Sequence, residues 1–499
     1  MSEWNRRKFL KTVGLGTAAL SLSQFEFCSL KDKEKPNIIF ILADDLGYNE
    51  LGCYGQTKIR TPNIDKLAEE GMKFTQHYSG SPVCAPSRCT LLTGKHTGHA
   101  YIRDNDEMTE RGDVWRDRSI EGQRPLLPNT VTIGTLLQNA GYKTGAIGKW
   151  GLGGPEDTGH PNKQGFDHWY GYLCQRVAHN YYPTHLWRNG EKDILEGNDY
   201  FYPHQKLPED KDPNDRASYE PYRGKVYSQD PMAEEALNFI RENKDNPFFL
   251  YLPFIVPHVS IQVPEDSLAE YEGEFEDTPY KGEKGYLPHP APRAGYAAMI
   301  TRMDREIGRI MDLLKELGID DNTLVVFTSD NGPTFNGGTD SEFFNSAGPL
   351  RGLKTQVYEG GIRVPMIARW NGKIKPGTVS NHISAFWDFM PTFADLLDID
   401  TQEETDGISI LPTLLGNSGK QEEHEYLYWE YRRQNQAVRM GDWKAVRLKP
   451  SDRIQLYNLR YDIGEKEDVA DRYPEIVDNI AEIMKNGRTE SEHFPIKWQ

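Results

Sequence analysis

Four short apolar segments, each leading into a polar or charged side chain, restrict the fold of this chain more than any other feature. They alternate with segments of helical periodicity. Strands that are apolar on both faces lie inside a parallel or mixed sheet covered by helices. We therefore predict an α/β fold with a large mixed β-sheet sandwiched by helices. The expected strands are residues 36–42, 144–148, 247–254 and 323–328, and the expected helices include residues 61–70, 131–140, 231–243 and 294–317.

Beyond about residue 406 the pattern changes to short strands with turn residues between them, followed by one closing helix. Gly441-Asp442 joins two of these strands as a hairpin signal. We therefore predict a small C-terminal antiparallel sheet with one helix. The predicted domains are a large α/β domain at residues 36–405 and an α+β subdomain at residues 406–499. The subdomain elements are expected at residues 425–430, 436–440, 443–447, 454–459 and 474–485.

The polar groups that follow the four central segments are of kinds that carry chemistry. Ligands of open α/β sheets bind beyond the carboxyl ends of the strands, so we expect these groups to share one edge. A lone aspartate at a strand end usually shapes a turn. Two adjacent aspartates after one buried strand, together with Asp-Asn-Gly after another, favour a metal site instead. Their oxygen donors suit Ca²⁺ or Mg²⁺ and not zinc. The groups are Asp44 and Asp45, Lys149, His258, and Asp330 with Asn331.

Cys84 lies where a helix is expected to begin. Pro86 suits the first helical turn because it lacks only an N–H that would be unpaired there. Arg88, one turn further on, adds a fixed positive charge near a helix terminus that already favours anions. The combination indicates a nucleophile that faces an anionic substrate. A buried free cysteine at the start of a helix is the alternative interpretation.

The formal net charge of −17 argues against nucleic acid as a partner, because binding phosphates requires a basic face. An anionic substrate must therefore be attracted by local cations or by a metal. The five cysteines have neither metal-ligand spacing nor an evident disulfide framework.

The N-terminus is typical of an exported protein. Asn5, Arg6, Arg7 and Lys8 precede a mildly apolar segment that is too short to span a bilayer, so residues 1–30 resemble a twin-arginine export leader. The expected location is periplasmic, or at the cell surface or beyond it, with Cys28 as a candidate lipidation site. No other stretch of the sequence is apolar enough for a transmembrane span.

The spacing C-x-P-S-R from Cys84 to Arg88 resembles the signature of the type I, formylglycine-dependent sulfatases, which have the alkaline-phosphatase superfold. The resemblance extends from about residue 36 to residue 470, with its blocks in the order of the family. These blocks are the strand and aspartate pair at 36–47, Gly148-Lys149-Trp150, Val256-Pro257-His258, Thr328-Ser329-Asp330-Asn331-Gly332, the run from Arg351-Gly352-Leu353-Lys354 to Pro365, and the strand at 456–462.

This resemblance implies a nucleophile and a cofactor. Cys84 is expected to be converted by a maturation enzyme to formylglycine, whose hydrate attacks the sulfate ester. Calcium, with magnesium as the lesser candidate, is expected to lower the pKa of the attacking hydroxyl and to neutralise charge on the sulfate. The implied metal ligands are Asp44, Asp45, Cys84, Asp330 and Asn331.

The resemblance also implies roles for the basic residues. Arg88 is expected to hold the formylglycine end, and Lys149 and Lys354 to bind the sulfate oxygens. His258 is expected to protonate the departing alcohol, with Lys354 as a candidate second donor. The covalent sulfate would then be expelled with regeneration of the aldehyde.

One position departs from the family pattern. Many relatives have a histidine where this chain has Gly151, and that histidine assists the release of sulfate. The base for this step is therefore open, and a water or Asp330 is one solution. The histidines that we consider as replacements are His96, His99 and His160.

The implied function is hydrolysis of a sulfated carbohydrate or aryl ester. A phosphate or phosphonate ester hydrolase of the same superfold is the nearest alternative, although such an enzyme more often has extra His and Asp ligands for two zinc ions. A protein that binds a sulfated glycan without turning it over is the second alternative.

The identity of the substrate does not follow from the sequence. Two loop-rich segments, residues 178–227 and 263–292, are either insertions near the mouth of the site or surface excursions. Several aromatic residues are available to stack on sugars, although packing in the core is the favoured interpretation. They are Trp169, Tyr170, Tyr172, Tyr181, Tyr182 and Trp187.

Overall fold

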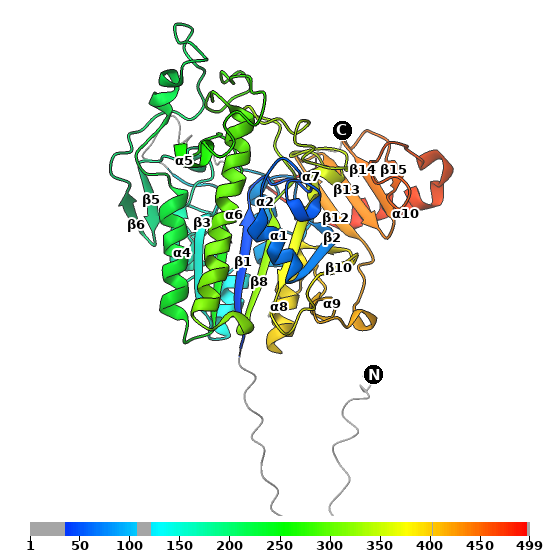
Figure 1. Cartoon of the computed structure of the whole chain (residues 1–499). Helices are drawn as coiled ribbons and strands as arrows, with labels where there is room; N and C mark the ends of the chain where they lie inside the picture. Colours follow the sequence, from blue (N-terminus) through cyan, green and yellow to red (C-terminus); the bar gives the residue numbers. More distant parts are fainter. Residues whose placement is uncertain (1–34, 107–120, 402, 497–499) are drawn as a thin grey trace, which may run out of the picture. The chain divides into compact units, whose positions relative to one another are not determined.

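The computed structural model describes residues 35–106, 121–401 and 403–496 (Figure 1). Within these residues the main element is an eleven-stranded mixed sheet, which confirms the predicted fold class. Its strands are β1 (Asn37–Ala43), β2 (Met72–Tyr78), β3 (Lys143–Lys149), β4 (His168–Tyr172), β5 (His185–Arg188), β6 (Glu191–Ile194), β7 (Phe248–Pro253), β8 (Thr323–Ser329), β9 (Arg363–Arg369), β10 (Thr378–Ser380) and β11 (Ser384–Ala385). Their order is β10-β2-β9-β8-β1-β7-β3-β4-β5-β6, and β11 pairs with β2.

The four strands expected from the sequence are neighbours in the middle of this sheet. β1 pairs in parallel with β8 on one side and with β7 on the other, and β7 pairs in parallel with β3. Every residue of β1 and β8 is buried, as expected for strands that are covered on both faces. Because parallel strands end on the same side, the residues that follow these four strands meet at one edge of the sheet.

Helices cover both faces of the sheet, and each face has its own core. Successive side chains of a strand alternate between faces, so Ile39 and Ile41 of β1 enter one core, and Ile38 and Phe40 enter the other. The first face is covered by α1 (Pro62–Glu69), α4 (Gln229–Asn243) and α6 (Pro292–Glu316), and the second by α2 (Cys84–Thr93), α3 (Ile133–Asn139) and α8 (Phe389–Leu397).

A small antiparallel sheet with one helix forms in the C-terminal part, as predicted. Ile480 and Met484 of the helix pack on one face of this sheet, and Trp429 on the other face donates a hydrogen bond from Nε1 to the Ser79 carbonyl, at 2.9 Å. The proposed domain boundary at residue 406 stays a prediction. The elements are β12 (Leu427–Tyr431), β13 (Asn435–Met440), β14 (Trp443–Arg447), β15 (Gln455–Asn458) and α10 (Pro474–Asn486).

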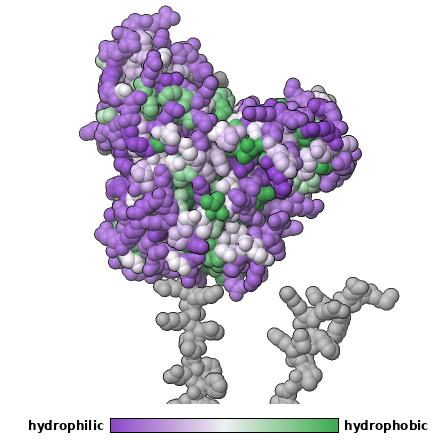
Figure 2. Space-filling view, turned by 45° about the vertical axis from the view of Figure 1, so that its right-hand side comes forward, coloured by the Kyte–Doolittle hydropathy of each residue, from purple (hydrophilic) through white to green (hydrophobic). Residues whose placement is uncertain are grey.

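The connections between these elements carry short helices, among them α5 (Glu265–Leu268), α7 (Glu359–Ile362) and α9 (Leu411–Leu414). The face drawn in Figure 2 is hydrophilic over most of its area, with separate small hydrophobic patches. Within the described residues no helix combines the length and the apolar character needed to cross a bilayer. The predicted export leader, including Cys28, lies outside the described residues.

Candidate active site

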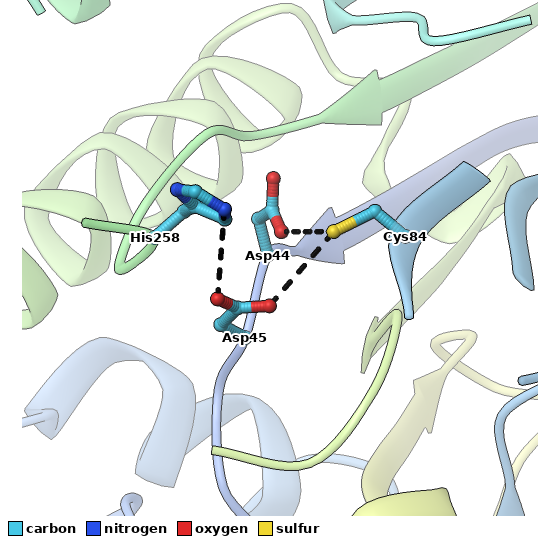
Figure 3. Close-up of side chains that lie close together, drawn as sticks. All are labelled: Asp44, Asp45, Cys84 and His258. Carbon is cyan, nitrogen blue, oxygen red and sulfur yellow. Dashed lines mark hydrogen bonds and ion pairs between the residues drawn. The ribbon is translucent and has the colours of Figure 1, made fainter. Parts of the chain in front are cut away.

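The residues to which the family resemblance assigns catalytic or metal-binding roles lie together at one edge of the large sheet. The edge is formed by the carboxyl ends of β1, β3, β7 and β8, by the start of α2 and by the loop before α7. Figure 3 shows four of these side chains converging from different elements. The residues at this edge are Asp44, Asp45, Cys84, Arg88, Lys149, His258, Asp330, Asn331 and Lys354, all of which are buried.

The chain turns sharply directly after β1. Asp45 has a φ of 66°, in the left-handed region that a continuing strand would not enter. Its backbone N–H donates a hydrogen bond of 3.1 Å to Oδ1 of Asp330, which follows the neighbouring strand β8. The Cys84 Sγ atom lies 3.1 Å from Oδ1 of Asp44 and 3.9 Å from Oδ1 of Asp45. The turn therefore brings both adjacent carboxylates to the side chain that begins α2.

Asn331 supplies the clearest indication of a missing partner at this site. Its Nδ2 donates to Oδ1 of Asp45 at 2.8 Å and to the Gly332 carbonyl at 2.9 Å. Its Oδ1 is buried and accepts no hydrogen bond from the described residues. A buried acceptor without a donor is costly unless a cation or a water completes it. The amide oxygen and the neighbouring carboxylates of Asp44, Asp45 and Asp330 therefore fit a hard cation such as Ca²⁺ or Mg²⁺.

Arg88 connects the carboxylates to the neighbouring strand. Its Nη2 lies 2.9 Å from Oδ2 of Asp330 and 3.3 Å from Oδ2 of Asp44, and its Nη1 donates to the Lys149 carbonyl. Its side chain is fully buried, so these charge-assisted bonds form without competition from bulk water. Arg88 therefore orders the site from within the first turns of α2.

Two lysines lie on either side of the Cys84 sulfur. The Lys149 Nζ pairs with Asp44 and lies 3.5 Å from Sγ. The Lys354 Nζ lies 2.7 Å from the carboxylate of Asp45 and 3.7 Å from Sγ. Two ammonium groups at this distance from one side chain create a local attraction for an anion, in a protein whose net charge is −17.

The carboxylates do not share one protonation behaviour. Burial raises the pKa of Asp330 to about 7, and the charge of Asp44 acts in the same direction. Burial would also raise the pKa of Asp44, but nearby cations, Lys149 first among them, hold it well below its usual range. Burial raises the pKa of Asp45. The present positive charges therefore do not fully compensate three carboxylates, which is a further reason why a divalent cation fits.

The Cys84 thiol is a poor nucleophile in this setting. Burial raises its pKa well above the ordinary value, and the charges of Asp330 and Asp44 raise it further. Since the thiolate and not the thiol attacks, an unmodified Cys84 would stay protonated and inert at neutral pH. A reaction at this position requires different chemistry from that of a catalytic cysteine.

His258 is held in one tautomer. Its Nδ1 donates to the Val259 carbonyl, and its Nε2 lies 3.8 Å from Oδ2 of Asp45. Burial, then the charges of Lys354 and Lys149, lower the pKa of His258 well below its ordinary value. The neutral ring therefore presents the lone pair of Nε2 to the site, and a proton bound there would be released readily.

The histidines considered for sulfate release are engaged elsewhere. His99 Nδ1 lies 2.8 Å from Asp406, the ring of His96 stacks on that of His99, and His160 Nε2 lies 3.0 Å from the Asn189 carbonyl. Gly151 has a φ of 79°, and a side chain there would meet two buried glutamines instead. Oε1 of Gln175 and of Gln123 would lie 3.1 and 3.4 Å from such a Cβ.

Sequence reasoning missed the aromatic residues that border the site. His179 stacks on His258, and Tyr286 lies against both rings. They belong to the two loop-rich segments, so these segments do reach the site, but no motif marks either residue. The aromatic residues proposed from the sequence as sugar-stacking candidates are instead buried, which agrees with their favoured interpretation as core residues. They are Trp169, Tyr170, Tyr172, Tyr181, Tyr182 and Trp187.

Two family models match the chain. The model described as Sulfatase matches residues 36–399, and that described as N-sulphoglucosamine sulphohydrolase, C-terminal, matches residues 353–490. The first model covers the whole of the large sheet and every residue of the site. The second overlaps it and continues through the C-terminal sheet.

Individual relatives agree with these matches. The N-acetylgalactosamine-6-O-sulfatase of Bacteroides thetaiotaomicron is 31% identical, over 92% of this chain and 94% of that protein. The steryl-sulfatase of Rattus norvegicus is 30% identical, over 82% and 75% respectively. The crystal structure of Ps i-CgsB in complex with k-i-k-neocarrahexaose superposes with a TM-score of 0.72 at 29% identity, covering 91% of this chain and 93% of that one.

Proposed function

The chain belongs to the sulfatase family and is an enzyme of sulfate ester hydrolysis; from this premise we propose that it removes sulfate from sulfated carbohydrates, by means of a formylglycine made from Cys84 and a calcium ion. The observation that carries the proposal is the position of the Cys84 sulfur, within 3.1 Å of Asp44 and within 3.7 Å of both Lys149 and Lys354. A nucleophile at this position would lie beside both ammonium groups, which can bind the oxygens of a sulfate ester.

Conversion of Cys84 accounts for a feature that the thiol leaves unexplained. The buried thiol has a raised pKa and would be inert, whereas an aldehyde hydrate supplies a hydroxyl that needs no thiolate. A formylglycine-generating maturation enzyme is thus a required partner. It would have to act before folding is complete, because only 1% of the Cys84 surface is exposed in the folded chain.

The oxygen donors of Asp44, Asp45, Asp330 and Asn331 would hold the cation, with residue 84 beside them. When bound, calcium supplies Lewis-acid stabilisation of charge on the sulfate and on the attacking oxygen. The unpaired Oδ1 of Asn331 supports this assignment.

The basic residues would bind the sulfate group, compensate the carboxylates and protonate the departing alcohol. Lys149 and Lys354 bind sulfate oxygens, and Arg88 compensates Asp330 and Asp44. Because the pKa of His258 is lowered, Nε2 must first take up a proton, which the negative charge of the bound sulfate ester favours. His258 then donates this proton to the departing oxygen as the sulfur–oxygen bond to the alcohol breaks. The Val259 carbonyl holds the other ring proton and so fixes the direction of this transfer.

The carbohydrate assignment rests on the relatives, one of which is named N-acetylgalactosamine-6-O-sulfatase and another of which was solved in complex with k-i-k-neocarrahexaose. Export by the twin-arginine-like leader would place the enzyme where extracellular polysaccharide is met. The hydrolysis of phosphate or phosphonate esters is the rival activity, and the all-oxygen ligand set favours sulfate.

The proposal is tested by incubating purified, matured protein with para-nitrophenyl sulfate and with para-nitrophenyl phosphate, before and after treatment with a chelator. Sulfate release that stops with the chelator and returns with calcium is expected, together with a formylglycine mass in the peptide containing position 84. If neither ester is hydrolysed under any condition, only the binding-protein alternative is left. If phosphate is released faster than sulfate, the rival hydrolase is favoured.

A further inference from the structure

A cluster of aromatic rings packs against His258. The rings of His258 and His179 are stacked, with centroids 4.8 Å apart and an angle of 17° between planes. Tyr286 lies 5.9 Å from His258 and 5.1 Å from His179, and its centroid is 4.5 Å from that of His204. The four rings come from separate segments of the chain, so only the folded protein assembles them.

The backbone at Tyr286 adopts a conformation that an aromatic residue rarely adopts. Tyr286 has a φ of 65° and follows Gly285, whose φ is 78°. A left-handed conformation is unfavourable for a non-glycine residue and persists only where the surroundings impose it. Here the Tyr286 N–H donates to Nδ1 of His204 at 3.4 Å, and the next N–H, of Leu287, donates to Oγ of Ser260 at 3.2 Å. The loop therefore holds the Tyr286 ring in a defined place.

The Tyr286 ring lies edge-on to the ring of His258, with centroids 5.9 Å apart and 75° between the planes. Burial raises the pKa of Tyr286 to about 12, and the positive charge of Lys354 opposes this shift. The phenol stays protonated at neutral pH and is available as a donor. Its hydroxyl makes no hydrogen bond with any residue that the structure describes, and part of the residue is exposed to solvent. A ligand in the site is the partner that this hydroxyl lacks.

The chemistry of the reaction places the alcohol part of the substrate beside this cluster. His258 protonates the departing oxygen, so the sugar that carries this oxygen must lie within reach of Nε2. An aromatic face packs well on the C–H face of a sugar ring, and a phenol can donate to a ring or hydroxyl oxygen. Lys149 and Lys354 hold the opposite, sulfate end.

We propose that Tyr286, supported by His179 and His204, forms a binding site for the sugar ring that leaves with its hydroxyl at His258, and that its phenol donates a hydrogen bond to an oxygen of that sugar. This inference rests on the proposed function. It makes Tyr286 a determinant of specificity for saccharides over simple esters, which neither its position in a loop nor any sequence motif indicates.

The test compares Tyr286→Phe and Tyr286→Ala with the unaltered protein, on para-nitrophenyl sulfate and on a panel of singly sulfated galactose, N-acetylgalactosamine and N-acetylglucosamine. Loss of one hydrogen bond is expected to lower kcat/KM for the preferred sugar about 3- to 10-fold in Tyr286→Phe. Tyr286→Ala also loses the stacking face, so a loss of roughly 30-fold or more is expected. Turnover of the aryl ester should fall by a smaller factor than turnover of the preferred sugar in both variants.

A second readout measures binding without the sugar being turned over. The desulfated sugar should inhibit hydrolysis of the aryl ester, and its inhibition constant should rise in both variants by factors similar to those for kcat/KM. Tyr461→Phe, at a tyrosine that is 84% exposed in the C-terminal part, is the control and should behave like the unaltered protein.

The outcomes are distinguishable. If the unaltered protein hydrolyses neither kind of ester, the proposed function fails. If it hydrolyses the aryl ester but no sugar of the panel, or if the Tyr286 variants lose activity equally on both, the sugar-binding role is overturned. An equal loss accompanied by a shifted pH profile would instead mean that Tyr286 only positions His258.

Discussion

Among the described residues, two buried clusters of opposite charges differ in whether every buried polar group has a partner. The first is the active site. The second, here called the C-terminal charge cluster, links α7 and β9 to the small sheet, and it comprises Glu359, Arg363, Arg439, Lys444 and Glu465.

In the C-terminal charge cluster each carboxylate has its partners. The Lys444 Nζ lies 2.9 Å from Oε1 of Glu359 and 3.5 Å from Oε1 of Glu465. The Tyr78 hydroxyl donates to Oε2 of Glu359 at 2.6 Å, and the Glu359 N–H donates to Oε2 of Glu465 at 2.8 Å. Among the described atoms, none of the buried side-chain polar atoms in this cluster lacks a hydrogen bond.

The active site contains similar groups but leaves Oδ1 of Asn331 without a donor. A complete buried network rigidifies a fold, whereas an incomplete one is costly unless a ligand completes it. The comparison teaches that burial and charge do not by themselves identify a functional site. The missing partner does.

The largest expected effect is a loss of activity at the active site. Cys84→Ala should lower kcat on the order of a million-fold, because it removes the residue from which the nucleophile is made. The matched change Cys89→Ala, also at a buried cysteine of α2, should leave turnover of folded protein within about twofold. Steady-state assays on para-nitrophenyl sulfate and thermal unfolding of each variant check this. Full activity of Cys84→Ala would contradict the proposed nucleophile.

A lysine in each cluster gives the next contrast. Lys444→Met leaves two buried carboxylates without their shared cation and should lower the free energy of unfolding, measured in urea, by about 3 to 5 kcal/mol. The specific activity of the folded fraction should not change. Lys354→Met should instead lower kcat by roughly 100-fold or more, because a charge that acts on the sulfate is lost. If Lys444→Met alters kcat of folded protein, the C-terminal charge cluster is not purely structural.

Calcium should stabilise the protein through one cluster alone. At about 100 times its dissociation constant the ion should add about 2.7 kcal/mol to the free energy of unfolding of chelator-treated protein. Asn331→Ala should require roughly 10- to 100-fold more calcium for the same gain, whereas Lys444→Met should keep the gain unchanged. Calorimetric titration of the three proteins measures this. An undiminished affinity in Asn331→Ala would remove its amide oxygen from the ligands.

The last effect concerns the dependence of stability on pH and leaves activity aside. Burial raises the pKa of Glu465 from 4.5 to about 7 in the folded protein, so the folded state favours its protonated form. The contribution of this group to stability is therefore complete below pH 4.5 and is lost as the pH rises toward 7. The slope is at most about 1.4 kcal/mol per pH unit. Glu465→Gln should flatten this part of the stability curve, whereas an unchanged curve would mean that Lys444 keeps Glu465 ionised.

Much of the site could be predicted because its residues follow central strands. Asp44, Asp45, Asp330 and Asn331 come directly after β1 and β8, and parallel neighbours bring their carboxyl ends together whatever the loops do. The apolar segments themselves follow from their composition, since strands buried on both faces have few alternatives. No strand leads into Lys354, so only the glycine-punctuated loop around it and the family resemblance indicate its role.

The sequence by itself therefore determined the layered fold and the edge at which the polar groups meet, and it led to the prediction that Cys84 is the source of the nucleophile. Only the tertiary structure decided which loops close over that edge. It brought His179 and Tyr286 against His258, and it placed glutamines, not a histidine, opposite Gly151. These contacts join loops that have neither periodicity nor a motif. Their energies depend on residues that are distant in the chain, so the local sequence pattern does not predict them.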